Sequence, residues 1–93
     1  MEARDIVCNN EDIFEFRLDC PRPSGLRAGI IVGIERDTSS MRYYLMMDLM
    51  RYPIQSGGTA HIADLASSAR SGSAALIVVL EVDDTLVTVR VCQ

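Results

Sequence analysis

The chain has 93 residues, of which 48% are hydrophobic and 24% charged, and its formal net charge is −4. This composition is typical of a globular protein, and the length predicts a single domain over residues 1–93. The acidic balance argues against a protein that holds nucleic acid by its phosphates, because such proteins carry an excess of basic residues. All nine basic residues are arginine, which excludes Schiff-base chemistry by lysine. Genome composition and selection for anion recognition both explain the arginine bias, and the choice between them stays open.

No apolar run reaches the roughly 18 residues of a membrane span. The first residues, MEARDIVCNNED, are acidic and lack the apolar core of a secretory signal, so we expect a cytoplasmic protein. The three cysteines are Cys8, Cys20 and Cys92, and an odd number without a signal peptide predicts reduced thiols. Together with the single histidine, His61, they could supply a Cys3His zinc site, but their scattered positions do not favour one. We therefore predict neither a metal nor a cofactor.

The first predicted strand is DIFEFRLD, residues 12–19, because apolar and charged residues alternate along it. Phe14, Phe16 and Leu18 share its apolar face. The prolines and the glycine of CPRPSG, residues 20–25, then end the strand and predict a turn.

LRAGIIVGIER, residues 26–36, predicts a second strand, because isoleucine and valine favour extended backbone. Alternate residues from Leu26 to Ile34 form its apolar face. Gly29 and Gly33 lie together on the opposite face, where they leave room for a large side chain or another backbone. The polar segment RDTSS overlaps the end of this strand and predicts a hairpin turn.

MRYYLMMDLMRYP, residues 41–53, is ambiguous between helix and strand. As a helix it would be capped by Ser40 and ended by its last proline. The short polar turn before it favours a strand. As a strand it carries apolar residues on both faces, one face more than a small domain buries. We therefore expect the face with Tyr44, Met46 and Met50 to be covered by a helix or by a second copy of the chain.

TAHIADLASSARSG predicts a helix over residues 59–71, with Thr59 as its N-cap and an apolar stripe that includes Ile62 and Leu65. AALIVVLEV, residues 74–82, is apolar at almost every position and predicts a central strand that is covered on both faces. The turn DDT and the alternating segment LVTVRVC complete a C-terminal hairpin.

These elements predict an α+β, β-rich fold, with an antiparallel sheet of four or five strands and one short helix over residues 59–71. An all-β small barrel, or a sandwich that dimerisation completes, fits the same pattern nearly as well.

No set of residues with a catalytic pattern is present. His61 and Asp64 would share a helix face, but one short helix does not bring a nucleophile, a base and oxyanion donors together. Residues 57–59 could contact a small anion at the start of the helix, but the lysine of a Walker loop is missing. We expect a protein without enzymatic activity.

Two sets of residues are candidates for binding a partner. Tyr44, Met46 and Met50 lie in a segment made largely of tyrosine, methionine and arginine, which protein interfaces favour. Arg22 and Arg27 flank the PSG turn, where they could hold an acidic group.

The leading hypothesis is a non-enzymatic protein-binding module that acts as a homodimer through protein–protein contact. The contact would use an edge strand or the Met/Tyr face. Two alternatives stay open: a small viral or phage-type accessory or inhibitor protein that binds a host factor, and a small enzyme or ligand carrier with its site between subunits.

Overall fold

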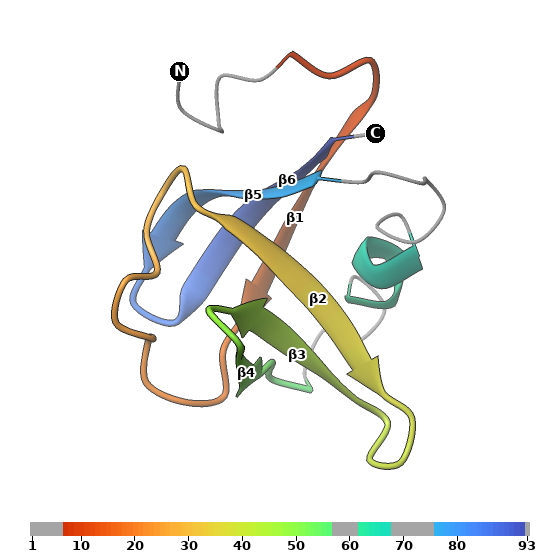
Figure 1. Cartoon of the computed structure of the whole chain (residues 1–93), viewed down its shortest axis with the longest axis vertical. Coiled ribbons are helices and arrows are strands. Elements are labelled where there is room, and N and C mark those ends of the chain that lie inside the picture. Colours follow the sequence, from red (N-terminus) through yellow and green to blue (C-terminus); the bar gives the residue numbers. More distant parts are fainter. Residues whose placement is uncertain (1–6, 57–61, 68–75, 93) are drawn as a thin grey trace.

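Six β-strands form one antiparallel sheet in the structure, a computed structural model that describes residues 7–56, 62–67 and 76–92 (Figure 1). Across the sheet the strands run in the order β1-β6-β5-β2-β3-β4. Their bounds are Glu11–Arg17 for β1, Ile31–Asp37 for β2, Arg42–Met47 for β3, Met50–Pro53 for β4, Leu76–Asp83 for β5 and Leu86–Cys92 for β6. Residues 62–67 form a short helix. The prediction of a β-rich antiparallel fold with one short helix is confirmed at this level.

The sheet has more strands than the four or five predicted, because residues 41–53 fold as a hairpin. They form neither one continuous strand nor a helix. β3 and β4 pair antiparallel, and Met47 lies opposite Met50. Asp48 and Leu49 make the turn between them, with φ angles of 51° and 67°. Two-residue turns with positive φ usually carry Asn-Gly or Asp-Gly, so a leucine here gives no turn signal in the sequence.

The second strand is shorter than predicted and begins at Ile31 instead of Leu26. Gly29 has a φ of 90°, a conformation that glycine adopts readily. Its backbone N–H donates to the carbonyl oxygen of Val79 at 2.8 Å, which ties the end of the loop to β5. Residues 26–30 are therefore a loop, although Leu26 is still buried in the core.

The alternating segments at the two ends of the chain fold as predicted. In and just after β1, Phe16 and Leu18 are buried. β5 lies between β6 and β2, and Val78 and Val79 are both fully buried, so this central strand is covered on both faces. The buried residues of β6 include Val87, Val89 and Val91.

The two edge strands of the sheet meet at one end. Leu18 and Ile54, just beyond β1 and β4, form an isolated antiparallel bridge. The backbone N–H of Gln55 also donates to the carbonyl oxygen of Arg17 at 2.7 Å. The sheet therefore curls toward a half-open barrel, while the rest of β1 stays at the edge (Figure 1).

The short helix packs on the inner face of this curled sheet. Ile62, Leu65 and Ala66 are buried, which confirms the apolar stripe predicted for the helix. Ile62 and Leu65 join the same core cluster as Leu45 of β3. The rest of the predicted helix, including Thr59, lies outside the described residues. The described part of the chain contains no helix that is long and apolar enough to cross a membrane.

Cys8 and Cys92 form a disulfide, with their Cα atoms 5.4 Å apart. The prediction of reduced thiols is wrong for this pair, whereas Cys20 is a free cysteine. The pair is separated by 84 residues in the sequence. The cysteines meet because β1 lies along β6, with Glu11 opposite Cys92, a relation that cysteine spacing does not reveal.

Candidate functional site

Tyr44 and Met46 of β3 lie on the outer face of the sheet, opposite to the face on which Leu45 and Met47 are buried. Both outer residues are half-buried. Met46 lies against Gly33 of β2, where an added Cβ would be 3.4 Å from the Cβ of Met46. A Cβ at Gly33 would therefore be at van der Waals contact with Met46, and Gly29, which the sequence predicted on the same strand face, lies in the loop before β2.

An ion pair crosses the outer face above Tyr44. Arg51 of β4 reaches Glu35 of β2, with Nη1 3.6 Å from Oε1. The Arg51 guanidinium lies 4.6 Å from the centroid of the Tyr44 ring, in the range of a cation–π contact. The sequence predicted that a helix or a second copy of the chain covers this face. The described helix does not, because its residues Ile62 and Leu65 join the core cluster on the inner face, and cover by a second copy stays a prediction. Charged side chains of the neighbouring strands cover Tyr44 instead.

Met50 does not share the face of Tyr44 and Met46, contrary to the prediction. Directly opposite residues of an antiparallel pair project to the same face, and Met50 lies opposite Met47, whose side chain is buried on the inner side. Met50 is 55% exposed, and Leu49 beside it is fully exposed at 102%. Sequence reasoning missed Leu49, because only the pairing of β3 with β4 shows that it forms the turn.

Arg22 and Arg27 lie in the loop between β1 and β2, and both are exposed. The Arg27 side chain donates from Nη1 to the carbonyl oxygen of Gly25 at 3.1 Å, so it stabilises the turn of its own loop. The two predicted sets of binding residues therefore belong to separate segments, one to this loop and one to the β3–β4 hairpin.

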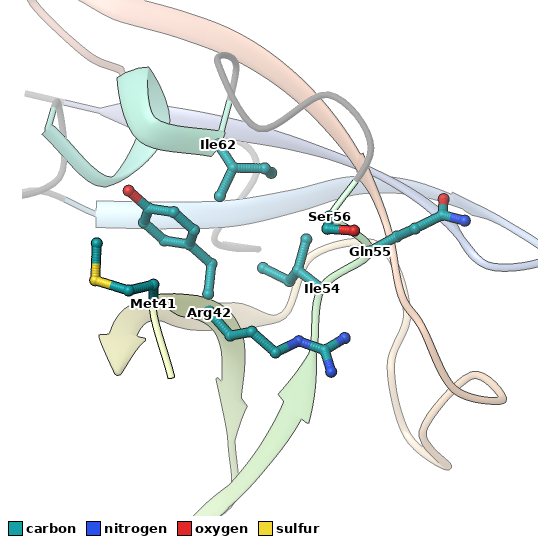
Figure 2. Close-up of a pocket in the computed structure, with 7 residues that line it drawn as sticks. Met41, Arg42, Ile54, Gln55, Ser56 and Ile62 are labelled. Carbon is teal, nitrogen blue, oxygen red and sulfur yellow. The ribbon is translucent and has the colours of Figure 1, made fainter. Parts of the chain in front are cut away.

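A pocket of about 100 Å³ lies between β3, the end of β4 and the helix (Figure 2). Its lining consists of Met41, Arg42, Tyr43, Ile54, Gln55, Ser56 and Ile62. Ile54 and Ile62 are buried and make its interior apolar, and Arg42 at its edge forms an ion pair with Asp19. Pockets for small molecules usually enclose about 300–1,000 Å³. This pocket has room for a group the size of one side chain and carries no acid–base pair in its lining.

The titratable groups of the described residues do not gather into a metal or acid–base site. No group of three His, Cys, Asp or Glu residues among them could hold a metal ion. Asp64 is exposed on the helix. The other predicted candidates for chemistry, His61 and residues 57–59, lie outside the described residues.

Asp37, the last residue of β2, has a pKa that lies below the ordinary value. The main cause is the Ser39 hydroxyl, which donates to Oδ1 at 2.8 Å, followed by the Ser39 backbone N–H at 2.9 Å. Both hydrogen bonds favour the charged carboxylate. Asp37 is therefore ionised at neutral pH and is unsuited to act as a general acid there.

Comparisons with known proteins identify no relative: the chain matches no protein-family model, no curated protein and no solved structure. A function is therefore inferred from the residues and geometry of the chain itself.

Proposed function

We propose that the protein is a non-enzymatic, homodimeric protein-binding module that contacts a partner protein through the turn of the β3–β4 hairpin. The observation that carries this proposal is Leu49. Its side chain is fully exposed and its φ is 67°, in the left-handed region. Met50, the next residue, is 55% exposed.

A leucine at this position weakens the fold. The left-handed conformation costs a residue with a Cβ roughly 1–2 kcal/mol, a cost that glycine avoids. The exposed Leu49 side chain also removes no apolar surface from water within the chain, so burial does not offset this cost. A strained residue is evidence for a role outside the fold. Contact with an apolar pocket of a partner would supply the missing burial.

The neighbours of the turn have the composition of an interface. Met46 and Arg51 lie opposite each other, next to the Met47–Met50 pair that flanks the turn. The Arg51 guanidinium lies over the ring of Tyr44. Arginine, tyrosine and methionine are the residue types that interfaces favour. We expect the partner to offer an apolar pocket for Leu49 and an acidic rim for Arg51, with Arg22 and Arg27 as a second contact.

The proposal can be tested with a photo-crosslinking amino acid at position 49, in an extract of the source organism. Position 84 is the matched control, because Asp84 also lies in an exposed hairpin turn with a positive φ of 56°. We expect a discrete adduct from position 49 that unlabelled wild-type protein suppresses and the Leu49→Gly variant does not. Equal labelling from the two positions, or no adduct from position 49, would contradict the proposal.

A further inference from the structure

We propose that the pocket at the start of β3 receives Leu49 of a second copy of the chain, in a dimer where two β3–β4 hairpins lie antiparallel about a twofold axis. The inference rests on the proposed function, because it names a second copy as the partner of Leu49. Met41 lines the pocket and directly precedes β3, whereas Leu49 follows the other end of β3 (Figure 1). A twofold axis beside the hairpin therefore brings each Leu49 to the pocket of the other copy and forms two identical contacts.

Met41 at the pocket and Leu49 at the turn share an unusual combination of backbone and exposure. The φ angle of Met41 is 61° and that of Leu49 is 67°. Met41 is 61% exposed, and Leu49 is fully exposed. The other described non-glycine residues with positive φ are Asp48 and Asp84, and aspartate adopts this backbone more readily than most residues. The two strained apolar residues therefore lie at the two places that the proposed dimer brings together.

The pocket matches one apolar side chain in size and lining. Its volume is about 100 Å³, and an apolar cavity of about 150 Å³ holds benzene, so the branched side chain of one leucine fits. The buried residues Ile54 and Ile62 line it, and the exposed Met41 extends its apolar surface outward (Figure 2). Entry of Leu49 would remove that side chain from water, which supplies the burial that one copy lacks.

Charged groups beside the pocket and beside Leu49 are complementary. Arg36 contacts two residues of the pocket lining: its Nη2 donates to the Met41 sulfur at 3.2 Å, and its guanidinium lies 5.9 Å from the centroid of the Tyr43 ring. A thioether is a weak acceptor, and among the described residues Arg36 has no carboxylate partner. Asp48, directly before Leu49, is exposed and forms no ion pair within the described part of the chain. Leu49 in the pocket would bring Asp48 to Arg36, and a carboxylate and a guanidinium form a strong charge-assisted bond.

The rim of the pocket also carries a carboxylate, because Asp19 pairs with Arg42 of the lining and its side chain is 47% exposed. The pocket thus has the two features expected of a partner for the β3–β4 turn, an apolar hole and an acidic group at its rim. Both halves of the contact are present in one chain, and two identical contacts close the dimer. This self-complementarity favours a second copy over an unrelated protein.

Sedimentation equilibrium of the full chain between about 1 and 200 µM tests the proposed ion pair by mixing charge-reversed variants. We expect the wild type to dimerise in this range. Asp48→Arg and Arg36→Asp should each raise the dimer Kd by about tenfold or more, because each places like charges together in both contacts. An equimolar mixture of the two variants restores an ion pair in both contacts, so its heterodimer should have a Kd within about threefold of the wild type.

A second hairpin turn supplies the matched control. Asp84 is also exposed, in the turn between β5 and β6, with a φ of 56° against 51° for Asp48. Asp84→Arg makes the same change of charge and should leave the Kd within about threefold of the wild type. Far-UV circular dichroism confirms that each variant is folded. Equal effects of Asp48→Arg and Asp84→Arg, or a mixture as weak as the single variants, would overturn the proposal.

Crosslinking of the purified protein locates the contact without a change of charge. A photo-crosslinking amino acid at position 49 should form a covalent dimer, and mass spectrometry of its peptides should find the attachment at Met41, Tyr43 or Ile54 of the second copy. The same amino acid at position 84 should form no covalent dimer. Attachment at other segments, or no covalent dimer from position 49, would contradict the proposal.

The purified protein and the extract together separate failure of this inference from failure of the proposed function. If position 49 forms no dimer in the purified protein but labels a different protein in the extract, the contact of Leu49 stands and its partner is not a second copy. If position 49 labels nothing in either sample, the proposed function fails as well.

Discussion

The β5–β6 and β3–β4 hairpins are both rich in apolar residues and both turn through two residues, yet their surroundings differ. β5 and β6 are inner strands of the sheet, and Val78, Val79 and Val89 among their residues are fully buried. β4 is a short edge strand, and Leu49 and Met50 at its start are exposed. The position of a hairpin in the sheet thus decides whether its apolar residues are buried in the core or exposed at the surface.

The largest effect is expected at the disulfide that joins the ends of β1 and β6. Cys8→Ser should lower the free energy of unfolding by about 3–5 kcal/mol, because the unfolded chain is released from a loop that spans most of its length. Thermal and denaturant unfolding followed by circular dichroism measure this change. A matched loss on adding reductant to the wild type, and none on adding it to Cys8→Ser, assigns the effect to the bond.

Thiol counting checks the same bond and bears on location. Of the three cysteines, the structure leaves Cys20 as the one free thiol. Titration of the unfolded, unreduced protein should therefore find one thiol and, after reduction, three. Cytoplasmic proteins usually keep their thiols reduced. Finding all three thiols free in protein trapped at cell lysis would favour the cytoplasm and contradict the bond in that setting.

A pair of truncations to alanine compares the two hairpins directly. Val89→Ala in β6 should cost about 2 kcal/mol, because it leaves a cavity at a fully buried site. Met50→Ala in β4 should change stability by less than about 0.5 kcal/mol, because half of that side chain is already exposed. Urea unfolding of both variants measures the difference. Equal losses would mean that the β3–β4 hairpin is as much a part of the core as β5–β6.

Leu49→Gly should stabilise the fold by about 0.5–1 kcal/mol while it removes the proposed contact. Glycine relieves the left-handed strain, and its greater freedom in the unfolded chain offsets part of the gain. The neighbouring substitution Met50→Gly is the control, because Met50 lies in β4 with ordinary strand backbone, and it should destabilise. A rise in melting temperature at position 49 but not at position 50 is the expected result.

The smallest effect is expected at Asp37. Its folded pKa lies below the ordinary value of 3.8, so its contribution to stability is present at neutral pH. This contribution is lost as the pH falls below that value and through the folded pKa. Ser39→Ala removes the hydroxyl that is the main cause and should raise the pKa of Asp37 toward the ordinary value. An NMR titration of the Asp37 carboxyl measures the shift, and an unchanged pKa would contradict this assignment.

Period-two alternation in the sequence predicted the buried faces of the strands well. Phe16, Leu18 and the valines of β6 were assigned from their spacing alone and are buried. The assignments failed at two turns that contain residues with positive φ. At Gly29 a turn shortens β2, and at Asp48 and Leu49 a turn divides one predicted strand into two. A leucine is a weak signal for such a turn, because its side chain disfavours the backbone that it adopts.

The residues of the candidate site were likewise predicted in part from the sequence and changed in part by an unpredicted turn. Residue type alone pointed to Tyr44 and Met46, which share the outer face of β3. The turn at Leu49 reverses the chain, so Met50 lies on the opposite face, and the same turn makes Leu49 the most exposed apolar residue of the hairpin. One turn that the sequence did not predict therefore decides which residues form the candidate contact surface.

Local spacing was sufficient for the class of the fold, the apolar faces of most strands and the stripe of the helix, because these depend on neighbours a few residues apart. The disulfide between Cys8 and Cys92, the contact of Leu18 with Ile54 and the place of β1 at the end of the strand order depend on how the strands are arranged across the sheet. That order joins residues far apart in the chain. It is set by burial of the whole core, which no short segment of the sequence records.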